Sequence, residues 1–217
     1  MRIEELRHKL LINGINQPFD IFDICSRFDD LDIKSVPFKT NGLRGMAIIA
    51  DKDSSLNCIL VNSNLDSSIQ NFHGFHELMH ICFAGKNQGQ TFTCYDKVQP
   101  HQNKYSEWLA NEGTAELLVP YKELLPLIKS NYAHLTQGIG TFEFCEKISS
   151  KFRVSPTVIQ NRIISLAYEI KQYISGVDID NIRILSKNQQ IKENIILKSL
   201  VDLEEKRILA TFKSNKA

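Results

Sequence analysis

The five residues from His76 to His80, which read His-Glu-Leu-Met-His, constrain this chain more than any other feature. From Ser67 onward apolar residues recur at helical intervals, so the pattern predicts that these five residues lie on a helix. Positions four apart on a helix lie one turn apart on the same face, so His76 and His80 project their imidazoles together. Two imidazole nitrogens so placed can bind one metal ion, as the H-E-x-x-H motif of metallopeptidases does.

Glu77 lies about 100° round the helix from His76, too far to bind the ion alongside both histidines. It is close enough to take a proton from a water on the metal, whose pKa zinc lowers to about 7. The motif therefore predicts Zn2+ as the ion, with another divalent ion such as Mn2+ as the alternative, and Glu77 as the catalytic base. The competing interpretation is a pair of surface histidines without a metal.

A catalytic zinc needs a third protein ligand and one open position. Glu107 is the candidate, because it lies on the next expected helix, residues 105–119, which can return across the first. Asn111 follows one turn later on the same face and could orient a ligand through a hydrogen bond. Glu112 and Glu116 remain alternatives on pattern alone, since they share a different face of that helix.

Composition excludes several other classes of protein. The chain has 26 basic and 25 acidic residues, which argues against binding nucleic acid or membrane through bulk charge. Its N-terminal residues alternate in charge where a signal peptide would be apolar, and no apolar run is long enough to span a bilayer. The odd number of cysteines and the absence of a C-x-x-C pair favour reduced thiols in a cytoplasmic protein without membrane contact. These cysteines are Cys25, Cys58, Cys82, Cys94 and Cys145.

The pattern along the chain predicts an α+β fold. Three strand-like segments, at residues 31–37, 45–50 and 58–61, are separated by turn-forming residues, so we expect a small three-stranded antiparallel sheet packed on helices. The stretch from residue 86 to 104 is polar and irregular. Helices are expected before Gly14, at residues 20–28, from Ser67 to Gly85, and at 105–119, 142–152 and 156–173.

The sequence resembles the ImmA/IrrE family of metallopeptidases over about residues 48–168. The likeness rests on Ile59-Leu60-Val61-Asn62, on the helix from Phe72 to His80, and on the block from Glu107 to Pro120. That block is the most distinctive part, because the family shows a Glu, then Ala-Asn, then Leu-Leu and a Pro at this spacing. The resemblance implies a zincin-like helical core around the motif, with Glu107 as the third zinc ligand.

Three positions depart from the family pattern. Met79 stands where the family usually has Gly, and Phe72-His73 stands where Phe-Thr is common. From these two departures we expect a changed cleft floor. Gly113-Thr114 replaces the more usual Phe-Ala, from which we expect looser local packing. None of these positions is a predicted ligand, so the resemblance still implies activity.

The resemblance also implies a substrate. Family members often cleave a helix-turn-helix transcriptional repressor and thereby release genes of a mobile element or a stress response. We therefore expect a repressor protein as the partner. The residues themselves leave open two other functions: a non-proteolytic regulator that binds a repressor or DNA around a structural metal, and a hydrolase of small peptides or amides. An intact Glu77 favours an enzyme, because a structural metal needs no base.

Residues 142–168 look like a helix-turn-helix, with Ser155 as N-cap and Pro156 at the first helical position. DNA binding would need several basic or amide side chains along the second helix. Gln160, Asn161 and Arg162 are few, so a structural or substrate-docking role is expected and direct DNA binding is left open. We divide the chain into a zincin-like metallopeptidase domain (1–135), a helix-turn-helix-like subdomain (136–175) and a C-terminal extension of undefined role (176–217).

The group that would stabilise the oxyanion opposite Glu77 is not singled out by the sequence. Several histidines and tyrosines are candidates: His73, Tyr95, His101, Tyr105 and His134.

Overall fold

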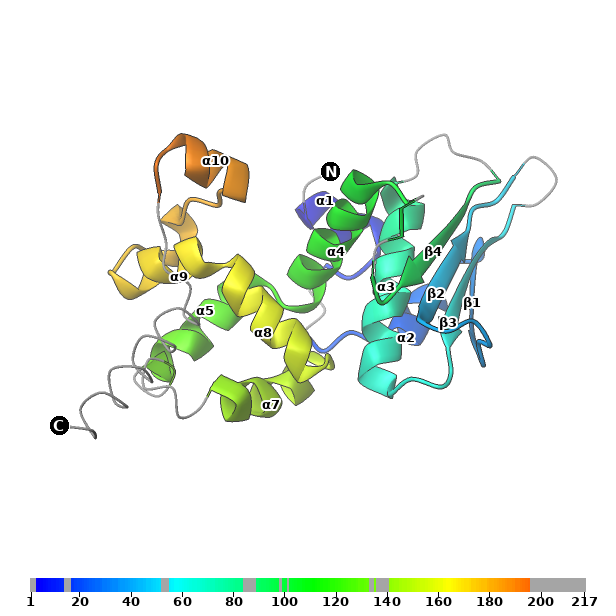
Figure 1. The fold of residues 1–217 in the computed structure, drawn as a ribbon, viewed down its shortest axis with the longest axis horizontal. Coiled ribbons are helices and arrows are strands. Elements are labelled where there is room, and N and C mark those ends of the chain that lie inside the picture. The colour runs from blue at the N-terminus through cyan, green and yellow to red at the C-terminus, as the bar shows by residue number, and fades with distance from the viewer. Residues whose placement is uncertain are drawn as a thin grey trace. The chain divides into compact units, whose positions relative to one another are not determined.

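The computed structural model describes residues 3–13, 17–51, 55–83, 89–97, 99–100, 102–132, 135 and 141–195. The chain divides into two compact units, which we describe separately. The first contains Met1–Leu118 and Ser150–Ser155, and the second contains Val119–Ser149 and Pro156–Ala217. Figure 1 labels the helices and strands.

The first unit is built on a four-stranded mixed sheet with the strand order β1-β3-β2-β4. The strands are β1 (Leu31–Val36), β2 (Leu43–Ile48), β3 (Asn57–Asn62) and β4 (Thr91–Tyr95). β2 is antiparallel to β3 and to β4, whereas β1 is parallel to β3. The fold class is therefore α+β as expected, but the expectation of three antiparallel strands is wrong.

The error has two causes. The turn at Asn41-Gly42, where Gly42 has a φ of 74°, does not join neighbouring strands, because β3 lies between β1 and β2. Turn chemistry shows where a chain reverses and does not show which strand it pairs with next. The second cause is β4, which lies within the stretch described above as irregular. Its sequence, Thr-Phe-Thr-Cys-Tyr, has the β-branched and aromatic alternation that identifies a strand.

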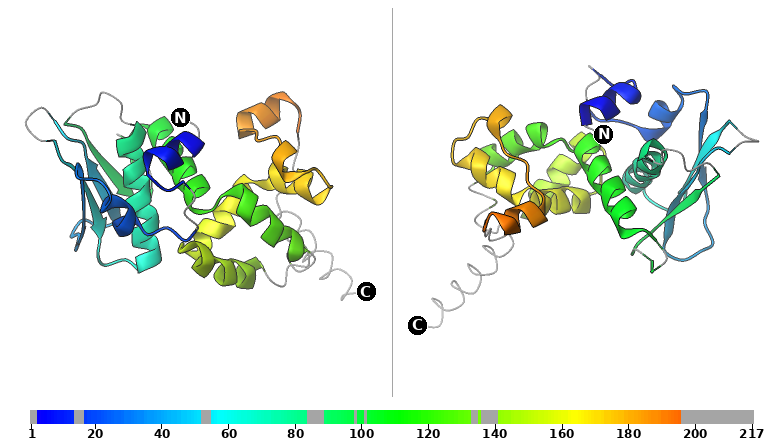
Figure 2. Two further views of the ribbon diagram at one scale, coloured as in Figure 1. Left: turned by 180° about the vertical axis from the view of Figure 1, so that it is seen from behind. Right: turned by 90° about the horizontal axis from the view of Figure 1, so that it is seen from above.

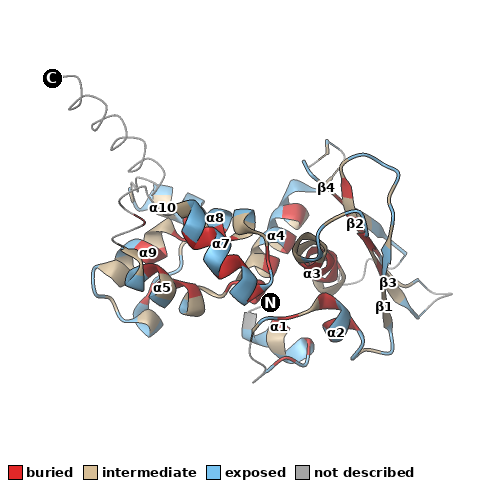
Figure 3. Cartoon of the chain, turned by 90° about the horizontal axis from the view of Figure 1, so that it is seen from below, coloured by how far each residue is buried: buried red, intermediate tan, exposed pale blue. Residues whose placement is uncertain are grey.

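The long helix α3 (Ser67–Phe83) covers one face of this sheet and contacts β2, β3 and β4. The helix α4 (Lys104–Leu118) packs against α3, as the two further views in Figure 2 show. Phe75, Leu78 and Met79 of α3 are fully or almost fully buried. Figure 3 shows buried residues on both α3 and α4. Two short N-terminal helices, α1 (Ile3–Lys9) and α2 (Ile21–Cys25), contact α4 and α3 respectively.

Asn71 fixes the base of α3 to two other segments. Its side-chain amide accepts a hydrogen bond from Ile21 N (2.9 Å) and donates to Phe19 O (3.0 Å) and Arg153 O (3.1 Å). Gly74 allows α2 to approach closely, because a Cβ there would lie 2.8 Å from the side chain of Ile21. The helix that carries the motif is thus held by the hydrogen bonds of Asn71 and by the close packing of Ile21 at Gly74.

The second unit is helical. Helix α8 (Pro156–Ser165) begins at the expected proline, and the expected long helix is interrupted at Leu166, where α9 (Ala167–Ile174) begins. Its other elements are α5 (Tyr121–Ser130), most of α7 (Thr141–Phe152), the 3-10 turn η1 (Ile179–Asn181) and α10 (Lys187–Lys192). The expected C-terminal extension lies outside the described residues from 196 onward. Among the helices described, none is long and apolar enough to cross a membrane.

Candidate metal centre

The two histidines of the motif meet inside the first unit. His76 and His80 project from the same face of α3, and their Nε2 atoms lie 3.1 Å apart. Only 1% of His76 and 2% of His80 is exposed, so neither is a surface histidine. The surface position that the interpretation without a metal assumed for these histidines is therefore wrong.

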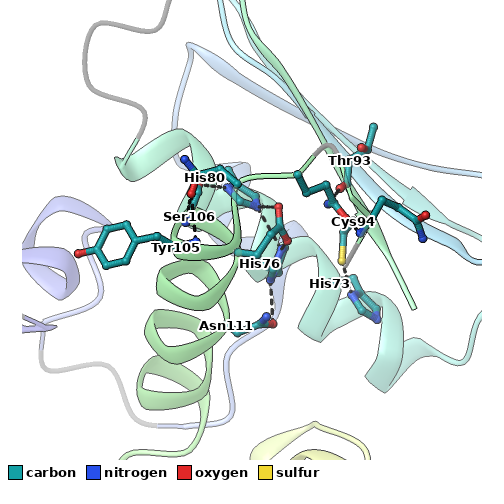
Figure 4. Close-up of polar contacts among 12 residues, drawn as sticks. His73, His76, His80, Thr93, Cys94, Tyr105, Ser106 and Asn111 are labelled. Atoms are coloured by element: carbon teal, nitrogen blue, oxygen red, sulfur yellow. Dashed lines mark hydrogen bonds and ion pairs between the residues drawn. The ribbon is translucent and has the colours of Figure 1, made fainter. Parts of the chain in front are cut away.

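Glu107, in the first turn of α4, joins them. Figure 4 shows His76 and His80, with dashed lines for the polar contacts around them. Its Oε2 lies 3.2 Å from Nε2 of His76, and its Oε1 lies 3.4 Å from Nε2 of His80. Among the described residues, Glu112 and Glu116 belong to no cluster of metal-binding side chains with these histidines. The packing of α4 on α3 thus selects Glu107 among the three carboxylates that the pattern left open.

The donor atoms fit a tetrahedral metal ion. Bonds of about 2.0–2.1 Å at tetrahedral angles place ligand atoms about 3.3 Å apart, and the three separations here are 3.1, 3.2 and 3.4 Å. Without a cation, at least one of the two facing Nε2 atoms would have to carry a proton to bond the other. Two imidazoles and one carboxylate leave a fourth position free, which is the arrangement of a catalytic site.

The protonation states also suit metal binding. Burial lowers the pKa of His76, which keeps its imidazole neutral. Burial alone would raise the pKa of Glu107, but hydrogen bonds with His76 and His80 outweigh it and lower the pKa to about 2. A neutral imidazole and an ionised carboxylate are the forms that bind a metal.

Outer groups hold the two imidazoles in place. Nδ1 of His76 lies 3.1 Å from Oδ1 of Asn111, so the tautomer with Nε2 free donates to that amide oxygen. Nδ1 of His80 lies 3.4 Å from the hydroxyl of Ser106. The ring of Phe92 on β4 stacks on His80 with centroids 4.5 Å apart. Asn111 was expected from its helical spacing, whereas Ser106 and Phe92 were missed.

Glu77 lies on the sheet side of α3 and is fully buried. Neither Oε1 nor Oε2 has a hydrogen-bond partner among the described residues. Burial, and then the charge of Glu107, raise the pKa of Glu77 well above its usual value. A buried carboxylate without a hydrogen-bond partner destabilises the fold, so its presence indicates a functional role for Glu77.

Gly45 on β2 makes the space that Glu77 occupies. A Cβ at this position would lie 2.8 Å from Oε1 and 3.0 Å from Cγ of Glu77, closer than real Cβ atoms come. Sequence reasoning missed Gly45, because no local signal connects a strand glycine with a carboxylate on a later helix.

Met79 and Gly113, both departures from the family pattern, explain one another. Met79 is fully buried, and a Cβ at Gly113 would lie 3.2 Å from its Sδ and 3.3 Å from Cε2 of Phe83. The methionine on α3 thus fills the space over the glycine on α4. Side-chain volume has been exchanged between the two helices, so the looser packing expected from Gly113 is not found.

The oxyanion candidates are dispersed. Nδ1 of His73 lies 3.3 Å from Sγ of Cys94, and burial, then the charges of His76 and Arg44, lower its pKa to about 3. Tyr105 is 68% exposed and lies beside Trp108, and Tyr95 ends β4. His101 and His134 lie outside the described residues.

Comparison with known families agrees with this geometry. The family model described as the IrrE N-terminal-like domain matches residues 29–164, a span that includes the motif, Glu107 and Asn111. No curated protein matches the chain. The chain belongs to the ImmA/IrrE family, and its function is of the metallopeptidase type.

Proposed function

We propose that the protein is a zinc-dependent endopeptidase that cleaves a partner protein, a helix-turn-helix transcriptional repressor, and so derepresses mobile-element or stress-response genes. One observation carries the catalytic part: His76, His80 and Glu107 converge beside a buried glutamate, Glu77, whose carboxylate has no hydrogen-bond partner among the described residues. The repressor as substrate rests on the family resemblance alone.

In this proposal His76, His80 and Glu107 hold the zinc. When bound, zinc supplies a Lewis acid that polarises the scissile carbonyl and activates water. Asn111 and Ser106 orient the two imidazoles, which keeps both Nε2 atoms directed at one point.

Glu77 takes the proton from the attacking water and returns it to the leaving amine. Burial, and then the charge of Glu107, raise the pKa of Glu77, which makes its carboxylate a stronger proton acceptor than an exposed one. Gly45 supports the role by leaving room for the carboxylate.

An extended substrate segment would bind along β4, which is an edge strand of the sheet. This strand lies beside the proposed metal ligands, because the ring of Phe92 stacks on His80. The main-chain carbonyl of Thr93 on this strand already accepts a hydrogen bond of 2.5 Å from the side chain of Gln102. An edge strand suits a protein segment better than a small peptide or amide, so it favours an endopeptidase over the small-substrate hydrolase.

The non-proteolytic regulator has less support. Arg162 is buried, and its Nε donates to the main-chain oxygen of Val119 (3.2 Å), so it is not presented to DNA. Arg153 forms an ion pair with Asp20 (2.5 Å). A structural metal would also leave the orphaned carboxylate of Glu77 without a purpose.

The proposal also keeps the domain boundaries at residues 135 and 175. It places the protein in the cytoplasm, where it would meet a repressor.

The test is cleavage of the repressor encoded next to this protein, by purified wild-type protein and by Glu77→Gln, followed by mass spectrometry. We expect Glu77→Gln to cleave about 10²–10⁴ times more slowly while its zinc content stays near one ion per chain. His80→Ala should lose the zinc. Equal cleavage by the wild type and Glu77→Gln would reject the proposal.

A further inference from the structure

In the described part of the chain, β4 pairs with a strand on one side only, and that strand is β2. The main-chain groups of successive residues in an antiparallel strand point to its two sides in alternation. Just before β4, Gln90 O accepts a hydrogen bond from Ile49 N (2.9 Å). Just after β4, Asp96 N donates to Gly42 O (2.9 Å). The even-numbered positions therefore face β2, and Thr93 presents its main-chain groups on the opposite side.

The side-chain amide of Gln102 occupies this other side at Thr93. Its Nε2 donates to Thr93 O (2.5 Å), and its Oε1 accepts a hydrogen bond from Gln99 N (2.5 Å). Gln102 N also donates to Gln99 O (3.0 Å), so a closed turn holds the amide in place. The glutamine thus takes the hydrogen bond that the N–H of an added strand would donate to Thr93.

This contact lies near the proposed metal ligands. Phe92, the residue before Thr93, stacks on His80. The residue after the glutamine is Asn103, whose side-chain oxygen accepts hydrogen bonds of 3.0 and 3.1 Å from the first turn of α4. That turn carries Glu107. The glutamine therefore closes the edge of β4 at the metal centre.

We propose that Gln102 is a plug on the substrate-binding edge. It closes β4 at Thr93 in the free protein, and an extended substrate segment must displace it to pair there. The plug rests on the proposed function, because it assumes that the substrate pairs along β4. Displacement breaks the hydrogen bonds of one amide, so the plug weakens the binding of every segment that pairs at Thr93.

The binding test uses the zinc-loaded full chain with Glu77→Gln as the parent, so that a bound chain is not cut. The probe is reduced, carboxymethylated α-lactalbumin, an unfolded chain, because main-chain pairing does not depend on one side-chain sequence. Adding Gln102→Ala should tighten binding about 2- to 10-fold, since one hydrogen bond no longer has to be broken. Fluorescence anisotropy of the labelled probe measures the Kd. Equal or weaker binding, or no binding, by the Gln102→Ala protein would overturn the plug.

Two further variants separate the plug from the turn that holds it. Gln102→Glu can still accept from Gln99 N but cannot donate to Thr93 O, so it should share the gain of Gln102→Ala. Gln99→Met is the matched control and should bind as the parent does, because the Gln99 side chain donates to Lys97 O (2.9 Å) and not to β4. A gain that Gln102→Glu lacks, or that Gln99→Met shares, would overturn the plug.

Nuclear magnetic resonance shows displacement directly. In the parent, the side-chain amide signals of Gln102 should move to those of an exposed glutamine as the probe saturates the protein. Unchanged signals with bound probe would contradict displacement.

Cleavage of the repressor distinguishes the plug from the proposed function. With Glu77 intact, Gln102→Ala should lower KM about 2- to 10-fold while kcat and zinc content stay near the wild type. If no protein cleaves the repressor but Gln102→Ala still binds the probe more tightly, the proposed function fails and the closed edge stands. If the wild type and Gln102→Ala cleave the repressor with the same KM, the plug fails and the proposed function stands.

Discussion

Helices α3 and α4 of the first unit and helix α8 of the second unit all bury charged or polar side chains, but in different ways. On α3 and α4, the polar atoms of His76, His80 and Glu107 face one another at 3.1–3.4 Å. On α8, Arg162 instead donates to the main chain, at Val119 O. Buried polar groups that meet at one point can bind a ligand, whereas one that bonds the main chain holds the fold.

The largest expected effect concerns the packing that brings α3 and α4 together. Met79→Gly removes a fully buried side chain and adds a helical glycine, so we expect a loss of about 3–5 kcal/mol in the free energy of unfolding. Gly113→Phe alone should overpack the same space and cost about 1–3 kcal/mol.

The double variant Met79→Gly/Gly113→Phe should recover at least half of the loss, because the volume is restored on the other helix. Urea unfolding of the zinc-saturated proteins measures all three variants. Additive losses in the double variant would show that the two positions do not compensate for each other.

Gly45→Ala probes the site without touching a ligand. The added methyl group must displace the carboxylate of Glu77, so kcat should fall about 10- to 100-fold while zinc content is unchanged. Because the effect acts through Glu77, Gly45→Ala should cause no further loss in a Glu77→Gln background. Equal fold-losses in both backgrounds would mean that the glycine serves the sheet instead.

Arg162→Met tests whether the buried polar group of α8 serves the fold and not the metal site. Removal of a buried donor from Val119 O should cost about 1–3 kcal/mol of stability, with zinc content and the kcat for repressor cleavage unchanged. Gln160→Met, at an exposed position of the same helix, is the control and should stay within about 0.5 kcal/mol. A salt-dependent loss of DNA binding in Arg162→Met would instead support the regulator.

The smallest effect near neutral pH is the acid sensitivity of the zinc-free protein. The pKa of His73 falls from 6.5 to about 3 on folding, so the unfolded chain binds more protons between these values. Stability is therefore full above about pH 6.5 and falls as the pH decreases, by up to about 1.4 kcal/mol per pH unit for this group.

His73→Asn should make that slope shallower, as followed by urea unfolding at a series of pH values. His8→Asn, at an exposed position, should leave the slope as in the wild type. An identical slope in His73→Asn would show that the imidazole is not held neutral.

Much of the fold was predictable from short-range pattern. The helices of the motif and of Glu107 follow apolar periodicity, and β1, β2 and β3 lie within two residues of the expected strands. The pairing of β1 with β3 was not predictable, because the contact joins segments separated by a whole strand. β4 was overlooked, although its alternating residues gave a local signal.

The sequence by itself determined the pair His76 and His80, because helix geometry alone places residues four apart on one face. It determined Asn111 relative to Glu107 for the same reason. The residue pattern left three carboxylates open and the family resemblance pointed to Glu107, but only the tertiary structure shows Glu107 beside the histidines. Only the tertiary structure shows that Gly45 makes room for Glu77 and that Cys94 lies against His73. Those contacts depend on how helices and strands distant in sequence pack together, and local backbone geometry does not fix that packing.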